Sequence, residues 1–133
     1  MAGRKHQFIL GLVIRQLRTY GCSIKYAEGK FIGDPIPKFP PKIINHRPDV
    51  VGITKDGQVC IGEAKTESDI YSQRTQTQLI DFVNLEINNM ICEVFIVVPK
   101  NSKTSFENLL KKLQINDRPN LHVLYVPEEI INE

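Results

Sequence analysis

Several features that mark other classes of protein are missing from these 133 residues. No apolar run approaches the roughly 18 residues needed to cross a bilayer, so no membrane-spanning segment is expected. The N-terminal residues are basic and amphipathic and lack the short apolar core of a signal peptide, which favours a cytoplasmic protein. Repeats and low-complexity tracts are also absent, and the length suits one domain over residues 1–133.

Cysteine is scarce, and its spacing excludes two common roles. Neither a zinc-binding spacing nor a Cys-x-x-Cys motif is present, and the three histidines are scattered along the chain. An odd number of isolated cysteines is typical of buried thiols in a reducing compartment. We therefore expect Cys22, Cys60 and Cys92 to be free and buried, with no zinc site.

Apolar periodicity predicts an α/β domain with the element order αβββαβαβ. Helices are expected over residues 4–20, 70–89 and 103–114, and strands over 22–27, on either side of a turn at 55–57, over 92–98 and over 121–126. The segment 29–47 contains four prolines and is expected to be a long irregular loop. A hairpin followed by strand–helix–strand crossovers gives a central mixed sheet flanked by helices.

The same periodicity predicts which side chains enter the core. In the first helix the apolar stripe is Ile9, Leu12, Val13, Leu17 and Tyr20, and a glycine at position 21 ends the helix. In the second helix, with helix-start chemistry in residues 66–69, the core face is Leu79, Ile80, Val83 and Ile87.

The most informative stretch is the hairpin around the turn 55–57. Asp49 begins the first strand directly after Pro48, and Glu63 and Lys65 lie at the end of the second strand. Because side chains alternate along a strand, Glu63 and Lys65 share one face. The other face carries small residues on which a helix can pack closely, namely Gly52, Cys60, Gly62 and Ala64.

The length of the turn decides whether the two acids meet. With three loop residues and the turn glycine in the left-handed conformation, Thr54 pairs with Gln58 and Asp49 lies opposite Glu63. A two-residue loop would place Asp49 opposite Ala64 and separate the acids onto different faces. The functional interpretation requires the three-residue turn.

Two carboxylates this close repel each other unless a positive charge lies between them. Oxygen ligands suit Mg²⁺ or Mn²⁺, which keep waters that a substrate phosphate can replace. Lys65 could orient a water and offset charge on a phosphorane-like transition state. The alternative is a surface hairpin with a Lys–Glu contact and an unpaired Asp.

The segments Arg47-Pro48-Asp49-Val50-Val51-Gly52 and Ile61-Gly62-Glu63-Ala64-Lys65 resemble the signature of the PD-(D/E)XK nuclease superfamily. This superfamily includes restriction endonucleases, archaeal Holliday-junction resolvases and repair exonucleases. The element order agrees along the chain, while the specific residues span 47–65. The resemblance implies a restriction-endonuclease-like fold, with Asp49, Glu63 and the backbone carbonyl of Ala64 as metal ligands and Lys65 as the catalytic lysine.

Many members of this superfamily also place a glutamine on the helix after the motif. Three glutamines lie there, namely Gln73, Gln76 and Gln78. The catalytic candidates among them are Gln76 and Gln78. Residues 78–82 are similar to a Gln-x-x-x-aromatic pattern of exonuclease-like members, with Phe82 in place of the usual Tyr. For each glutamine the alternative is a solvated position on the helix surface.

The chain departs from the superfamily in its first helix. Members commonly supply a Glu from this helix, whereas residues 1–20 contain no acidic residue. The place could be taken by His6, Gln7 or Gln16, or by Glu28 or Asp34 folding back from the following loop. Two other readings stay open: a single metal held by two carboxylates, or a loss of activity.

The net charge of +2 conceals an uneven distribution. Residues 1–48 carry nine Lys or Arg against two acidic residues, and the remainder carries eight against thirteen. A basic segment next to a metal site favours contact with a nucleic-acid backbone, although a solvated helix and loop would show the same pattern. The basic residues expected to contact DNA are Arg4, Lys5, Lys38, Lys42, Arg47 and Arg74.

Two functional hypotheses follow. The first is a Mg²⁺-dependent DNA endonuclease, with Mn²⁺ as a substitute, of a junction-resolving or repair type. The chain has no insertion to read bases, so recognition by DNA shape is expected, and a symmetric junction would require a homodimer. The second is a non-catalytic module of the same fold that binds nucleic acid or protein. A third, weaker alternative is a toxin or defence component using the same hydrolysis.

Overall fold

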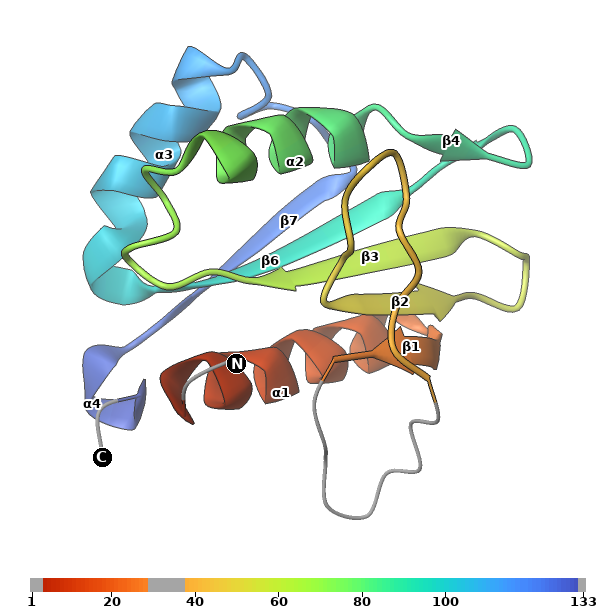
Figure 1. The fold of residues 1–133 in the computed structure, drawn as a ribbon, viewed down its shortest axis with the longest axis horizontal. Coiled ribbons are helices and arrows are strands. Elements are labelled where there is room, and N and C mark those ends of the chain that lie inside the picture. The colour runs from red at the N-terminus through yellow and green to blue at the C-terminus, as the bar shows by residue number, and fades with distance from the viewer. Residues whose placement is uncertain (1–3, 29–37, 132–133) are drawn as a thin grey trace.

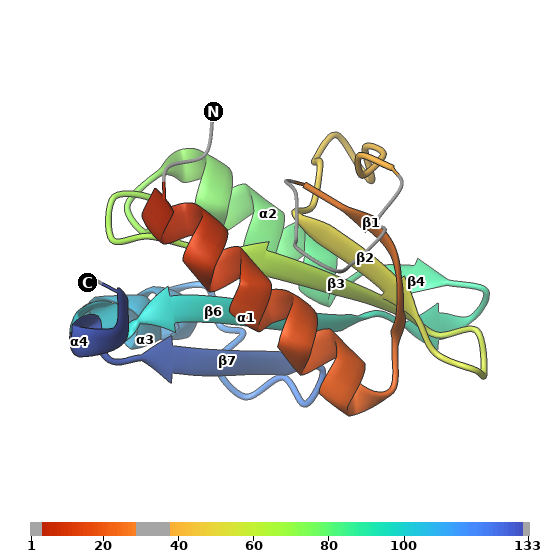
Figure 2. The same ribbon diagram turned by 90° about the horizontal axis from the view of Figure 1, so that it is seen from below.

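A five-stranded mixed sheet in the order β1-β2-β3-β6-β7 forms the centre of the protein (Figures 1 and 2). The structure, a computed structural model, describes residues 4–28 and 38–131. The sheet consists of β1 (Ser23–Ala27), β2 (Val50–Ile53), β3 (Val59–Ala64), β6 (Glu93–Pro99) and β7 (Leu121–Val126). β1, β2 and β3 pair antiparallel, whereas β6 pairs parallel with both β3 and β7.

Helices cover both faces of the sheet and enclose two apolar cores. One face packs against α1 (Arg4–Tyr20), and the other packs against α2 (Gln73–Val83) and α3 (Lys103–Lys112). A short turn of 3₁₀ helix (Lys100–Ser102) leads into α3, and α4 (Glu128–Ile131) follows β7. The predicted α/β class and the order of the main elements are therefore confirmed. None of the described helices is both long and apolar enough to cross a membrane.

The first helix ends as its sequence predicts. Gly21 adopts a φ of +105°, and its N–H donates to Arg18 O at 3.0 Å while Cys22 N–H donates to Leu17 O at 3.0 Å. These two bonds form a Schellman cap, which favours glycine because a side chain is strained at this φ. The predicted apolar stripe was partly wrong, because it omitted two residues that are buried and included Tyr20, which is 43% exposed. The omitted residues are Leu10 and Ile14.

The hairpin has the three-residue turn that the functional interpretation requires. Gly57 has a φ of +87°, and Thr54 N–H donates to Gln58 O at 3.0 Å. Val50 pairs with Gly62, which continues the register that places Asp49 opposite Glu63. The prediction of the register is confirmed.

The small face of the hairpin lets α1 approach the sheet closely, also as predicted. A Cβ atom built on Gly62 would collide with Val13 and would lie 3.0 Å from Leu17, both on α1. Cys60 and Ala64 are buried in the same core. Packing against α1 therefore fixes which side of β3 faces the helix.

The helix predicted over residues 70–89 is shorter at both ends. It begins after Ser72, whose Oγ accepts from Thr75 N–H at 3.1 Å, and ends at Val83. The chain then forms a small hairpin of β4 (Glu86–Ile87) and β5 (Met90–Ile91). Its turn residues Asn88 and Asn89 have φ values of +56° and +64°, which asparagine tolerates well, so two-residue turn chemistry prevailed over helical periodicity.

Two further details of that helix were predicted incorrectly. Ile80, expected in the core, is 38% exposed, whereas Phe82 is fully buried beside Leu79. The predicted helix-start chemistry in residues 66–69 instead closes a turn, in which Thr66 N–H donates to Asp69 Oδ2 at 2.8 Å.

All three cysteines are buried and free, as expected. Of the predicted loop 29–47, residues 29–37 lie outside the described part of the chain.

Candidate active site

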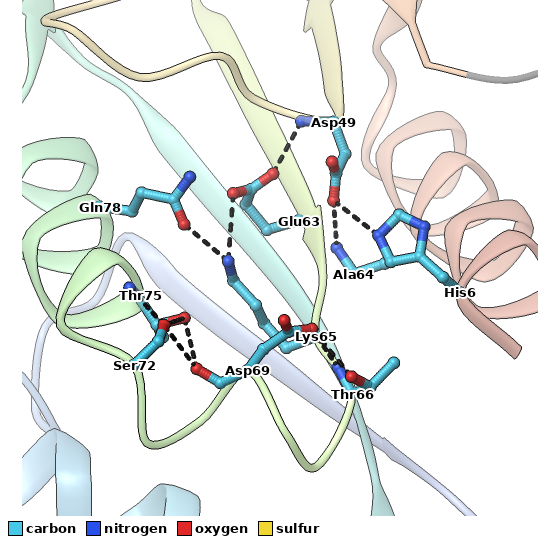
Figure 3. Close-up of polar contacts among 10 residues, drawn as sticks. All are labelled: His6, Asp49, Glu63, Ala64, Lys65, Thr66, Asp69, Ser72, Thr75 and Gln78. Atoms are coloured by element: carbon cyan, nitrogen blue, oxygen red, sulfur yellow. Dashed lines mark hydrogen bonds and ion pairs between the residues drawn. The ribbon is translucent and has the colours of Figure 1, made fainter. Parts of the chain in front are cut away.

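An open cleft of about 690 Å³ lies where β3 ends and β2 begins. Its floor is formed by residues 63–65, and its walls come from the start of α1, the loop of residues 38–48 and the first half of α2. Figure 3 shows residues of the cleft from α1, from the start of β2, from the end of β3 and the turn after it, and from α2. The ends of two neighbouring strands and the starts of two helices therefore meet at one place.

The carboxylates of Asp49 and Glu63 each accept a hydrogen bond from a backbone N–H of the neighbouring strand segment (Figure 3). Asp49 N–H donates to Glu63 Oε2 at 2.7 Å, and Ala64 N–H donates to Asp49 Oδ2 at 2.9 Å. Glu63 is only 2% exposed. The carboxylates are thus brought together by the register and oriented by backbone donors on the opposite strand.

The electrostatics of the two acids are unequal. Burial, and then the negative charge of Asp49, raise the pKa of Glu63 to about 8, and the nearby Lys65 only partly opposes this. Burial would also raise the pKa of Asp49, but contacts from His6 and the Ala64 N–H outweigh it and lower that pKa below its usual value. Burial and the charge of Asp49 therefore disfavour the ionised form of Glu63, and additional positive charge would favour it.

Lys65 is held by a glutamine from α2. Its Nζ donates to Gln78 Oε1 at 2.6 Å and lies 3.6 Å from Glu63 Oε1. Both Lys65 and Gln78 are almost completely buried, at 8% and 2% exposed. Of the two glutamines named as catalytic candidates, Gln78 lines the cleft and Gln76 does not.

Two of the residues considered as replacements for a first-helix carboxylate interact with Asp49. His6 Nε2 lies 3.6 Å from Asp49 Oδ2, and this contact raises the pKa of the imidazole above its usual value despite the opposing effect of burial. Burial and then contact with Asp49 raise the pKa of Glu28. Both line the cleft, whereas Gln7 and Gln16 do not, and Asp34 lies outside the described residues.

Basic side chains surround this acidic floor. The residues expected to contact DNA that line the cleft are Lys5, Lys42, Arg47 and Arg74. Lys38 is exposed but does not line it, and the side chain of Arg4 lies outside the described part of the structure. We refer to the four lining residues as the basic rim.

The sequence interpretation missed a hydroxyl network that shapes one wall of the cleft. Asp69 accepts from Thr66 Oγ1 at 2.9 Å, and its backbone oxygen accepts from Thr75 Oγ1 at 2.6 Å and Ser72 Oγ at 3.0 Å (Figure 3). The spacing of Thr66 and Asp69, and of Ser72 and Thr75, is the pattern of a capped turn followed by a capped helix. This spacing in the sequence indicates two separate caps, whereas the sequence interpretation predicts a single helix start at residues 66–69.

The donors available for a metal ion are mainly the carboxylates of Asp49 and Glu63. Within residues 4–28 and 38–131, no three His, Cys, Asp or Glu side chains are grouped so that they could hold one ion. A cation bound by Asp49 and Glu63 would therefore complete its coordination with backbone oxygen and water. That is the usual arrangement for Mg²⁺, which keeps several of its waters.

The fold and the cleft define an α/β protein with an acid–lysine cluster where the interior strand β2 begins and the central strand β3 ends. No protein-family model matches the chain, and no curated protein matches it. Among solved structures it is similar to one titled "crystal structure of a repair endonuclease from Pyrococcus abyssi", at 17% identity and a TM-score of 0.45 over 96% of this chain. The chain spans 48% of that structure. At this level of similarity, no role or activity transfers from that protein.

Proposed function

We propose that this protein is a metal-dependent DNA endonuclease of the PD-(D/E)XK type, acting on junction or repair substrates. The observation that carries the proposal is the convergence of Asp49, Glu63 and Lys65 in one cleft, with Gln78 holding the lysine. Without a cation, burying two neighbouring carboxylates destabilises the fold. A functional requirement for their charge explains why they are there.

The donor set fits the metal that the motif implies. Asp49 and Glu63 would hold Mg²⁺ or Mn²⁺ through carboxylate oxygens, and the motif adds the backbone carbonyl of Ala64. The raised pKa of Glu63 supports this assignment, because a bound cation would stabilise the ionised form that burial and the charge of Asp49 disfavour. When bound, the cation would polarise the scissile phosphate and lower the pKa of a coordinated water.

Lys65 and Gln78 then act on the water and the phosphate. An ammonium has three N–H donors; Gln78 Oε1 accepts from one of them, and Glu63 Oε1 lies at ion-pair distance, 3.6 Å away. A remaining N–H can orient a water for in-line attack, and the charge can offset the negative charge that develops on the phosphate. Gln78 fixes the position of the Lys65 ammonium, because the side chain of Gln78 is itself buried. By resemblance to the superfamily, the products would carry 5′-phosphate and 3′-hydroxyl ends.

The basic rim supports DNA as the substrate. Its side chains come from α1, from the loop 38–48 and from α2, so a phosphate backbone could follow the rim over the acidic floor. Contacts of this kind recognise the shape of the substrate rather than its sequence. Resolution of a symmetric junction would require two copies of the chain related by a two-fold axis.

A cleavage panel tests the proposal. Supercoiled plasmid, linear duplex, single strands, RNA and a four-way junction are incubated with Mg²⁺, with Mn²⁺ and with EDTA. We expect metal-dependent cleavage of DNA that falls at least about 100-fold in Asp49→Ala and Lys65→Ala. Asp56→Ala and Lys55→Ala, which change the same residue types on the exposed hairpin turn, serve as matched controls and should remain active.

Two outcomes would overturn the assignment. Cleavage that persists in EDTA, or in the Asp49 and Lys65 variants, would place the chemistry elsewhere or in a contaminant. Binding of nucleic acid without cleavage of any substrate would favour the non-catalytic alternative.

A further inference from the structure

We propose that Phe39 and Arg47 form a stacking site for one unpaired base beside the cleft. The protein would accordingly select DNA with a single-stranded segment at the point of cleavage. This inference rests on the proposed nuclease function and specifies its substrate class.

The stacking site is an exposed aromatic ring supported on one side by a guanidinium. Phe39 is 56% exposed, and the Arg47 guanidinium carbon lies 5.0 Å from the centre of its ring. Arg47 Nη1 also donates to Pro40 O at 2.6 Å, which fixes the guanidinium in place. Phe39 is more than half exposed although Arg47 lies over its ring, so part of its aromatic surface remains accessible to a ligand. A flat ligand that stacks on this ring fits the site.

The loop that carries this pair is anchored on the rest of the fold. His46 Nε2 lies 2.7 Å from Asp81 Oδ2 on α2, and its ring packs edge-on against Phe82 at 5.6 Å. Ile43 and His46 exchange two backbone hydrogen bonds, at 2.6 and 3.0 Å. A surface fixed before binding loses little conformational entropy when a ligand stacks on it.

The loop also contains a strained residue. Ile44, next to the anchor, has a φ of +48°, which is unfavourable for a β-branched side chain. Residues in such conformations persist where the surroundings impose them, and they concentrate at functional sites. The loop conformation is therefore maintained at a cost in stability, which is consistent with a binding role.

The position of the pair identifies the ligand as part of the substrate. Arg47 lines the cleft and lies two residues before Asp49, so their Cα atoms are at most about 7 Å apart. The phosphate of a nucleotide whose base stacks on Phe39 would thus lie near the basic rim and the acidic floor. The charge of the rim favours a nucleotide over an uncharged aromatic ligand.

Only an unpaired base can use this ring. In a duplex the faces of the bases are covered by their neighbours, and exposing one requires unstacking. Aromatic side chains that bind single strands stack on bases of any sequence. Flaps, gaps, bulges and single strands provide such a base, whereas an intact duplex does not.

Binding measured without cleavage tests this inference separately from the nuclease activity. Fluorescence anisotropy in EDTA would compare a labelled single strand, a flap and the corresponding duplex, with an RNA strand as a further arm. We expect Phe39→Ala to weaken binding of the single strand and the flap roughly 5- to 150-fold, the range for one base–aromatic stack, and to change duplex binding less than about twofold. Phe39→Trp should retain the binding of the wild type.

Tyr71→Ala is the matched control. Tyr71 is 72% exposed, but its hydroxyl donates to Ser105 Oγ on α3 at 2.9 Å and it does not line the cleft. The inference is overturned if Phe39→Ala binds the single strand like the wild type, if it loses duplex and single strand equally, or if Tyr71→Ala loses as much. A Phe39-dependent preference for single strands without any cleavage would support the stacking site while contradicting the nuclease proposal.

Discussion

Replacing Glu63 with Gln should stabilise the protein in the absence of metal, and increasingly so as the pH rises. Burial and the charge of Asp49 raise the pKa of Glu63 from 4.5 to about 8. A carboxyl group with a raised pKa on folding favours the folded state most when it is protonated. That contribution is complete below pH 4.5 and is lost as the pH rises towards about 8.

The magnitude follows from the same two values. At about 1.36 kcal/mol per pH unit, the difference between the unfolded and folded pKa of Glu63 lowers the free energy of unfolding by about 3 kcal/mol at pH 7 and on the order of 4 kcal/mol at pH 8, relative to low pH. Most single-domain proteins have only about 5–15 kcal/mol of stability, so this term is large. Between pH 5 and pH 8, the difference in unfolding free energy between Glu63→Gln and the wild type should widen by about 3 kcal/mol.

Urea unfolding followed by circular dichroism, at several pH values between 5 and 8 and without metal, measures this difference. Comparing the two proteins cancels the titration of other groups, and Asp56→Asn on the exposed turn controls for removing one charge. Saturating Mg²⁺ should restore much of the lost stability in the wild type but not in Glu63→Gln. A pH-independent difference, or equal stabilisation of both proteins by Mg²⁺, would refute the assignment of Glu63 as the group that needs the cation.

Three further predictions address the support of the site, the packing and the rim. Gln78→Ala should lower kcat by roughly 100-fold with little change in KM, because the Lys65 ammonium loses its orienting oxygen, whereas Gln76→Ala should behave like the wild type in the same steady-state assay. Gly62→Ala should lower the unfolding free energy by about 1–3 kcal/mol or prevent folding, because the new methyl group meets α1; a denaturant melt within 0.5 kcal/mol of the wild type would contradict this. Arg74→Ala should reduce by about one the slope of log Kd against log salt for DNA, and an unchanged slope would remove Arg74 from the phosphate contacts.

The sequence predicted the parts of the site that depend on local rules. Side-chain alternation and a three-residue turn ending in Gly57 were sufficient to place Asp49 opposite Glu63. The basic rim was predicted in part, because charge segregation along the chain marked the right segment. The distribution of charge along the sequence could not distinguish Lys42, which lines the cleft, from Lys38, which does not.

The remaining parts depend on tertiary packing that local patterns do not encode. Which glutamine reaches Lys65 depends on where α2 begins, and the early capping pattern at residues 66–69 placed that start too far towards the N-terminus. The approach of Glu28 to Asp49 depends on how the chain leaves β1. Sequence periodicity does not indicate this path of the chain, so Glu28 was one of five candidates to replace the missing first-helix glutamate.

The site could be located from sequence because its register is shared with the core. The alternation that points Glu63 and Lys65 towards α2 also points Gly62 towards α1, where only a hydrogen atom fits beside Val13. A one-residue slip of the hairpin would push a large side chain into α1 and would separate the two acids at the same time. Core packing therefore excludes the slipped register, and the cost of burying two carboxylates is offset by contacts on the opposite face of the same strand.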